Sequence, residues 1–226
     1  MGSERRPFRG FPQLAESEAE VGAKLIFLPG RLTAAVKNST RKGTLFFVVH
    51  KHRATSLHYD FRLEIGGVMP SWSIPKGPSL DSAVRRLAMP TSDHDLDYRH
   101  FEGVLPPGYG AGPVMVWDEG TYNPEVEISK GVRAEVTDRK EAERVASESL
   151  KEGNLKFRLY GKKLEGSFAL VRTAGFGGKE SWLLIKHRDE YSRPGYDAKD
   201  YDFSAVSKRS IAQIASEGES GTTPFT

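Results

Sequence analysis

The sequence has 226 residues, of which 38% are hydrophobic and 28% are charged, so it can form a packed core and wholesale disorder is excluded. No apolar run reaches the length of about 18 residues that a spanning helix needs, and the absence of cysteine excludes disulfides, a thiolate nucleophile and Cys-ligated zinc. The formal net charge is +3, and residues 1–50 carry eight Lys/Arg against four Asp/Glu, a mild bias toward anionic partners.

The N-terminal residues 1–43 are expected to form a partly ordered arm with one apolar patch at 25–28. Residues 1–9 are charged and lack the apolar stretch of a secretory signal, so we expect a cytoplasmic protein without membrane association. The dense strand signals begin at Thr44. Strand 57–65 alternates strictly, and Gly66-Gly67 after it is a two-residue hairpin signal. The expected strands are 44–49, 57–65, 68–74, 87–89, 114–117, 126–128, 155–160, 167–171 and 182–186.

One helix is well signalled. Asp138 can cap it, Glu141 follows three residues later, and an apolar stripe runs from Ala142 to Leu150 before Gly153 ends it. A weaker helix is expected over about 207–216, with a fraying tail from Glu217. Many short strands with one or two helices predict a mainly β fold, a small closed or partly closed β-barrel with flanking helices. We expect the barrel domain to cover 44–200 and a C-terminal extension to cover 201–226.

Five of the six histidines lie between residues 50 and 100. If 57–65 is a strand, its apolar side chains share one face, and His58, Asp60, Arg62 and Glu64 share the other. Imidazole and carboxylate suit a borderline divalent metal, with His50 or His52 as a third ligand and open positions for water and substrate. Arg62 offers a guanidinium that matches phosphate oxygens. The segment therefore predicts a metal-dependent phosphate-ester site, against the plainer interpretation of a solvated strand face.

Two further patterns bear on the chemistry. His58-x-Asp60 with a distant third ligand, His94 or His187, would also suit a non-haem Fe(II) oxygenase in which Arg188 holds a co-substrate carboxylate. In residues 93–98, a loop or short helical turn could place His94 and Tyr98 on one face, where both could contact a phosphate; a solvated acidic turn is the alternative. The glycines of 108–112 lack the Lys-Ser/Thr of a Walker loop, so we expect a tight loop entering the next strand. Trp72, Trp117 and Trp182 are expected in the core.

The ordered motifs resemble one known family. Residues 52–64 (HRATSLHYDFRLE) closely resemble the signature of the 3′-phosphoesterase domain of bacterial DNA ligase D. The similarity continues through further motifs over about 44–190, at 71–80 (SWSIPKGPSL), 93–98 (DHDLDY), 101–103 (FEG), 109–112 (YGAG), 117–118, 164–172 (LEGSFALVR) and 182–188 (WLLIKHR).

The resemblance implies a small β-barrel and a Mn²⁺-dependent enzyme of end-joining repair, with Zn²⁺ or another divalent metal as alternatives. Such an enzyme removes a terminal ribonucleoside from the 3′ end of a primer strand and then hydrolyses the remaining 3′-phosphate to a 3′-OH. By motif, His52, His58 and Asp60 would hold the metal, and Arg62, His94 and Tyr98 would hold the scissile phosphate, with His94 as a candidate acid. His50 and Glu64 are candidate accessory residues.

The implied partners are primer–template 3′ ends and separate polymerase and ligase proteins, since those modules do not occur in these 226 residues. Relatives usually carry Gln at the position of His50, the stretch 106–109 is about one residue shorter than usual, and the family's N-terminal Arg-Asp pair has no clear match in 1–43. The phosphatase step is therefore the firmer expectation. A catalytically weakened DNA-end-binding module is the alternative.

Overall fold

A computed structural model describes residues 44–108, 110–175, 178 and 180–219. The predicted arm at 1–43 and the end of the predicted tail, 220–226, lie outside the described residues. In the described part, neither helix has the length or the apolar character needed to span a bilayer. The strands are β1 (Leu45–Arg53), β2 (Leu57–Leu63), β3 (Met69–Ile74), β4 (Arg85–His94), β5 (Gly103–Leu105), β6 (Gly112–Ser129), β7 (Val132–Glu135), β8 (Asn154–Gly161), β9 (Glu165–Arg172) and β10 (Trp182–Lys186). The helices are the 3₁₀ turns η1 (Leu96–His100) and η2 (Ala198–Asp200) and the α-helices α1 (Arg139–Glu152) and α2 (Ile211–Glu219).

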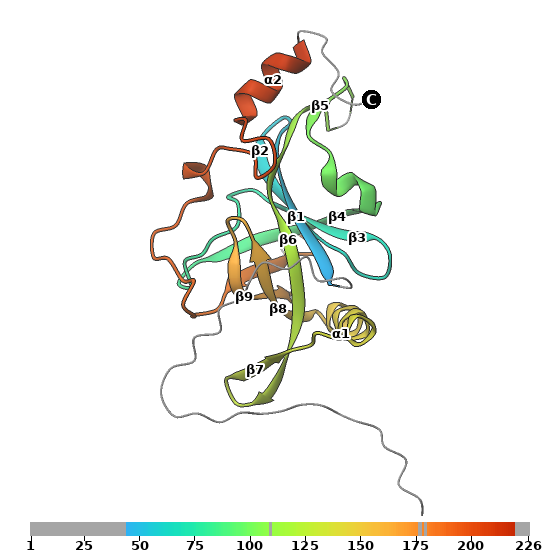
Figure 1. Ribbon diagram of the computed structural model, residues 1–226, viewed down its shortest axis with the longest axis vertical. Coiled ribbons are helices and arrows are strands. Elements are labelled where there is room, and N and C mark those ends of the chain that lie inside the picture. Colours follow the sequence, from blue (N-terminus) through green and yellow to red (C-terminus); the bar gives the residue numbers. More distant parts are fainter. Residues whose placement is uncertain (1–43, 109, 176–177, 179, 220–226) are drawn as a thin grey trace, which may run out of the picture. The chain divides into compact units, whose positions relative to one another are not determined.

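Eight strands close into an antiparallel barrel in the order β1-β2-β3-β4-β10-β9-β8-β6, and the pairing of β6 with β1 completes the ring (Figure 1). This confirms the predicted β-barrel with two flanking α-helices. The apolar alternation in the strands fills the interior, where Phe47, Tyr59, Phe61 and Trp117 are buried. Trp72 and Trp182 are buried as well and meet edge to face, as expected of core residues.

The long strand β6 organises the barrel. The sequence predicts two short strands at 114–117 and 126–128, but the structure has a single strand of 18 residues. Along its length β6 pairs in turn with β5, β1, β8 and β7, so neighbouring strands hold its polar middle section in extended form. Strands β5 and β7 were not predicted, because each is short and pairs only with β6. Strand β4 is also longer than the predicted 87–89.

The structure confirms the predicted hairpin turn and both predicted ends of the first α-helix. Gly66 and Gly67 have φ of 64° and 81°, which a two-residue hairpin turn between β2 and β3 requires. Asp138 accepts the Glu141 N–H at 3.0 Å, and Gly153 ends α1 in the left-handed region at φ 81°. The second helix begins at Ile211 and continues to Glu219, so the prediction of a tail fraying from Glu217 is wrong for its first three residues.

The C-terminal segment packs on the barrel. The Ala205 N–H donates to the Val116 carbonyl at 2.8 Å, and Trp117 Nε1 donates to the Tyr201 carbonyl at 2.9 Å. Glu102 joins the same contact: one carboxylate oxygen accepts from the backbone of β6 and the other from Arg209 at 2.8 Å, just before α2. These bonds fix the outer side of β6 next to the strands that carry the candidate site.

Candidate metal and phosphate site

Strands β1 and β2 bring the predicted site residues together on the outer face of the barrel. In their antiparallel register His52 lies opposite His58, His50 opposite Asp60, and Val48 opposite Arg62. The intervening residues of both strands point into the core, so the polar residues form a ladder on the outside. This ladder is not a solvated face: Asp60 is 7% exposed and Arg62 3%, and Tyr98 of η1 lies over the Arg62 guanidinium.

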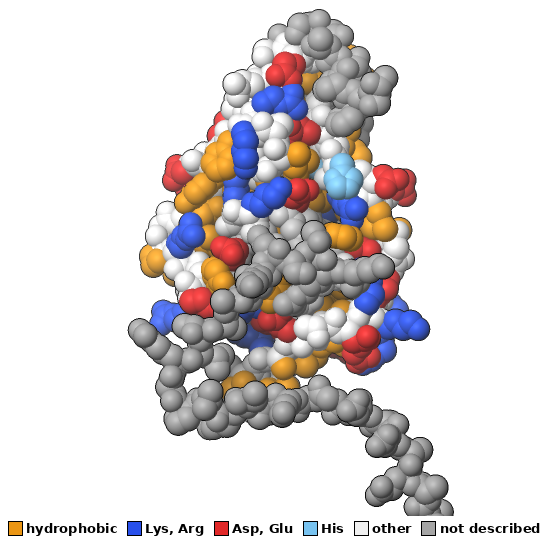
Figure 2. Space-filling model, in the orientation of Figure 1, with side chains coloured by type: hydrophobic (Ala, Val, Ile, Leu, Met, Phe, Trp, Pro, Cys, Tyr) orange, Lys and Arg blue, Asp and Glu red, His pale blue; other side chains and the backbone are white. Residues whose placement is uncertain are grey.

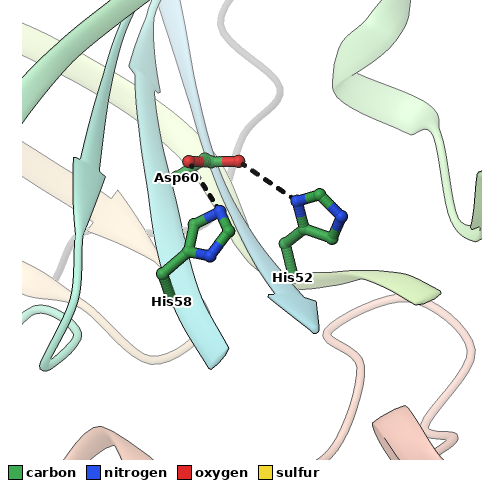
Figure 3. A group of neighbouring side chains, drawn as sticks. All are labelled: His52, His58 and Asp60. Carbon is green, nitrogen blue, oxygen red and sulfur yellow. Dashed lines mark ion pairs between the residues drawn. The ribbon is translucent and has the colours of Figure 1, made fainter. Parts of the chain in front are cut away.

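The first group on the ladder has the composition of a metal site. One ligand atom from each of His52, His58 and Asp60 lies within 4.8 Å of the other two (Figure 3). The nearest ring nitrogens, His58 Nε2 and His52 Nδ1, lie 3.6 Å and 4.0 Å from the carboxylate oxygens of Asp60. Two imidazoles and a carboxylate suit Mn²⁺ or Zn²⁺ and leave coordination positions open.

The surroundings of His58 prepare it for a metal. Its Nδ1 lies 3.0 Å from the Ser56 carbonyl, and donation to that oxygen fixes the tautomer in which Nε2, the nitrogen facing Asp60, is unprotonated. For His52, burial lowers the pKa, and the neighbouring His58 lowers it further. The first feature turns an acceptor nitrogen of His58 toward Asp60, and the second favours the neutral ring of His52, the form that binds metal, so the residues present fit a divalent ion.

The second group centres on the buried guanidinium of Arg62. Its Nη2 donates to Asp60 Oδ2 at 3.1 Å, and its Nη1 donates to Ser71 Oγ at 2.7 Å. Its Nε donates to His50 Nδ1 at 3.2 Å, and Nη1 also lies 2.9 Å from His94 Nδ1. Arg62 is therefore rigidly placed with the metal group on one side and His94 on the other, the placement that a phosphate clamp needs.

Tyr98 and His94 complete this group from above the ladder. His94 ends β4, and η1 carries Tyr98 back over the strand face. The Tyr98 ring lies 4.8 Å from the His94 ring and 5.3 Å from the Arg62 guanidinium, and it stacks on Phe101 at 5.2 Å. Burial raises the pKa of Tyr98, so its hydroxyl stays a donor. Burial and the Arg62 charge lower the pKa of His94.

The structure gives His50 a place beside Arg62 and not in the metal group. It is fully buried, and burial together with the Arg62 charge lowers its pKa well below the ordinary value. Its ring meets Tyr98 edge to face at 5.4 Å. The sequence offers His50 and His52 as candidates for the third ligand. In the structure His52 groups with His58 and Asp60.

Glu64, a candidate accessory residue, lies apart from both groups. Strand β2 ends at Leu63, and the Glu64 carboxylate accepts from the Phe46 N–H at 3.0 Å and from Arg139 of α1 at 2.6 Å. These contacts tie α1 to the barrel, so Glu64 has a structural role in this arrangement.

The residues that would complete an Fe(II) oxygenase site are not assembled. His187 follows β10 and contacts Ser167 of β9 at 2.8 Å, and β9 stands four strands from β2 in the eight-stranded ring, on the opposite wall. His94 approaches Arg62 instead of the His58–Asp60 pair.

Sequence reasoning gave no role to Ser71, which lies opposite Arg62 on β3. Its hydroxyl donates to the Met69 carbonyl at 2.8 Å and accepts from Arg62, so it helps to fix the guanidinium. The only signal was its place in a motif of the family resemblance, since one serine in a strand has no pattern of its own. The glycine loop before β6 borders the metal group, because the ring of His52 lies beside Gly110.

Comparison with known proteins gives a family match over more than half of the chain. The family model of the DNA ligase D 3′-phosphoesterase domain matches residues 50–172, more than half of the chain. The multifunctional non-homologous end joining protein LigD of Pseudomonas aeruginosa is 42% identical over 190 residues, which cover 82% of this chain and 20% of the relative. The corresponding proteins of Mycobacterium tuberculosis and Mycolicibacterium smegmatis are 38% and 33% identical over 64% and 76% of this chain. The chain thus spans about a fifth of the length of these relatives, and it belongs to the DNA ligase D 3′-phosphoesterase domain family.

Proposed function

We propose that this chain is a divalent-metal-dependent phosphoesterase that processes DNA 3′ ends for non-homologous end joining. The substrate is a primer strand that ends in a 3′-phosphate, and the product carries a 3′-OH. The observation that carries the proposal is the contact between the two groups of the site: Asp60 belongs to the candidate metal group and also accepts from Arg62 at 3.1 Å. A phosphate held by Arg62 therefore lies beside the metal position.

In this proposal His52, His58 and Asp60 hold the metal, with Mn²⁺ as the leading candidate. When bound, the metal supplies Lewis-acid stabilisation of the charge that develops on the phosphate oxygens. Membership of a family whose described relatives act in end joining supports the assignment of the substrate.

Arg62, His94 and Tyr98 bind and orient the phosphate. Arg62 and the Tyr98 hydroxyl donate to its oxygens, and their fixed positions avoid reorganisation when charge develops. In hydrolysis, water adds to phosphorus, the bond to the 3′-oxygen breaks, and that oxygen takes up a proton.

His94 can serve this proton transfer. With Arg62 at its Nδ1, the neutral ring carries its proton on Nε2 and donates a hydrogen bond to the phosphate or the leaving oxygen. The Ser92 carbonyl lies 2.9 Å from the same Nδ1 and can accept from the protonated ring. Burial and the Arg62 charge lower the pKa of His94 and favour the neutral ring, which donates from Nε2.

The test is a primer–template with a 5′-labelled primer ending in a 3′-phosphate, incubated with Mn²⁺. We expect conversion to a 3′-OH product and no conversion in excess EDTA. Binding without conversion would instead support a DNA-end-binding module, and turnover that needs 2-oxoglutarate and oxygen would support an oxygenase. A second primer ending in one ribonucleoside tests whether the chain also removes that nucleoside, leaving a 3′-phosphate. The polymerase and ligase activities that would use the 3′-OH belong to the proposal as partners.

A further inference from the structure

The ladder of outward-facing residues on β1 continues past the phosphate group. Along this face of β1 the residues His52, His50 and Val48 are followed by Phe46, which lies beside Glu64, the residue directly after β2. Two residues of a strand span about 6.8 Å. Phe46 therefore lies about one rung beyond the pair of Val48 and Arg62, on the side away from the metal group.

Phe46 and Arg99 form a flat, charged stack at this position. Phe46 is 36% exposed, and the Arg99 guanidinium lies 4.1 Å above its ring. Arg99 follows Tyr98 on η1, so the same short turn supplies a residue of the phosphate group and the cation of the stack. Arg99 Nε donates to His100 Nε2 at 2.8 Å, and no carboxylate of the described residues forms an ion pair with it.

Charge is mixed around the phosphate group. Asp93, Asp95 and Asp97 are exposed from the end of β4 into η1 and would repel a DNA backbone, so this segment attracts a strand through Arg99 and not through its net charge. On the described part of the face in Figure 2, basic and acidic side chains are interspersed with hydrophobic ones, which favours local contacts over a broad basic field. An uncompensated cation on an exposed ring is such a local contact.

We propose that the Phe46–Arg99 stack receives the base of the nucleotide immediately 5′ to the terminal 3′-phosphate nucleotide of a DNA strand. The inference rests on the proposed function, which places the terminal phosphate at Arg62. Bases stack on guanidinium planes and aromatic rings without regard to sequence, so the stack would position any strand end. The charge of Arg99 adds attraction to the strand backbone.

The test compares two oligonucleotides that end in the same 3′-phosphate. One has an intact nucleotide next to the terminal one, and the other has an abasic site there. We expect the wild type to lose about tenfold in kcat/KM with the abasic strand. Arg99→Ala and Phe46→Leu should each lose about tenfold in kcat/KM on the intact strand. They should show no further loss with the abasic strand, because the contact between the stack and the base is already absent in these variants.

Two variants serve as controls. Lys140→Ala removes an exposed charge from α1 and should behave as wild type on both strands. Arg53→Ala removes an exposed charge at the end of β1, next to His52, and should retain the full discrimination against the abasic strand. The proposal would be overturned if Arg99→Ala lost a further tenfold in kcat/KM on the abasic strand. It would also be overturned if Arg53→Ala lost the discrimination between the two strands while Arg99→Ala kept it.

A binding measurement separates this inference from the proposed function. Fluorescence anisotropy with the same two labelled strands reports the stack even if the wild type releases no phosphate. In that case the proposed function fails, while weaker binding of the abasic strand by wild type, and equal binding of both strands by Arg99→Ala, would still support the stack. Equal binding of both strands by the wild type would refute it.

Discussion

Arg62 donates from Nε to Nδ1 of His50 across 3.2 Å, inside a site where His50 is fully buried. The histidine must therefore accept, which requires a neutral ring with its proton on Nε2. A glutamine could accept through its side-chain oxygen, so His50 and the Gln that relatives usually carry are equivalent for Arg62. We therefore propose that His50 positions Arg62 and that the metal ligands are the group His52, His58 and Asp60.

We predict that His50→Gln keeps kcat/KM for 3′-phosphate release within about threefold of wild type. His50→Leu should lower it about tenfold or more, because the buried guanidinium loses an acceptor at a cost of about 1–3 kcal/mol. Steady-state kinetics on a 3′-phosphate primer checks both variants, and Mn²⁺ titration should show unchanged affinity in each. A large loss of Mn²⁺ affinity in His50→Gln would show that His50 is a ligand after all.

Substitutions at the candidate metal group should separate its two roles. His58→Ala should weaken Mn²⁺ binding by more than about 100-fold, since even outer-shell partners of metal ligands contribute about 10–100-fold. Part of its rate should return at saturating Mn²⁺. Asp60→Asn should lose both affinity and rate, because Asp60 also holds Arg62 at 3.1 Å. Calorimetric Mn²⁺ titration, with exposed His100→Ala as the control, measures the affinity, and steady-state kinetics measures the rate. Wild-type affinity in His58→Ala would contradict the assignment.

Tyr98→Phe tests the phenolic hydroxyl without removing the ring. The variant keeps the stack on Phe101, at 5.2 Å and 10° between the planes, and the edge contact with His50. If the hydroxyl donates to the phosphate, kcat should fall about 10- to 100-fold while the melting temperature stays within about 2 °C. A rate equal to that of wild type would limit Tyr98 to packing.

How far the sequence alone predicts this site depends on the kind of contact. Strict alternation in 57–65 predicts the shared face of His58, Asp60 and Arg62, because strand geometry fixes it locally. The register that brings His52 opposite His58, by contrast, depends on the turn at 54–56 and on which strands pair. Resemblance supplied the choice of His52 over His50, and the residues alone left both open.

The same distinction between local and long-range determinants applies to the fold. Apolar runs and turn residues predict β10 and α1 at their observed bounds, since burial and capping act within each segment. The full length of β6 depends on four partner strands, so its polar middle section has no local signal. Glu64 illustrates the limit of local prediction. Strand alternation predicts the same face for Glu64 as for the site residues, but its ion pair with Arg139, 75 residues later, determines its role.

Glu64→Gln should therefore affect stability and leave catalysis unchanged. The carboxylate is buried and pairs with Arg139, whose side chain is 33% exposed, so solvent screens part of the attraction. We expect a loss of about 1–2 kcal/mol, or roughly 2–8 °C in melting temperature, with kcat/KM for phosphate release within twofold of wild type. Thermal unfolding and kinetics on the same preparation check this. Arg144→Gln, which breaks solvent-exposed pairs on α1, is the matched control. A large loss of rate in stable Glu64→Gln would restore Glu64 to the site.

His187 should make the fold sensitive to acid. Burial and the charges of Arg133 and Lys156 lower the pKa of His187 to about 4, while in the unfolded chain it titrates near 6.5. Between these values the unfolded state binds a proton that the folded state does not, so the free energy of unfolding falls as the pH drops from 6.5 to 4. For this partly exposed ring we expect a contribution of about 1–2 kcal/mol after allowance for solvent screening.

His187→Gln, which stays neutral and can still bond to Ser167, should reduce the difference in stability between pH 7 and pH 4.5 by that amount. Urea unfolding in EDTA at both pH values measures it, with His100→Gln as the control, and parallel pH profiles for wild type and His187→Gln would contradict the expectation.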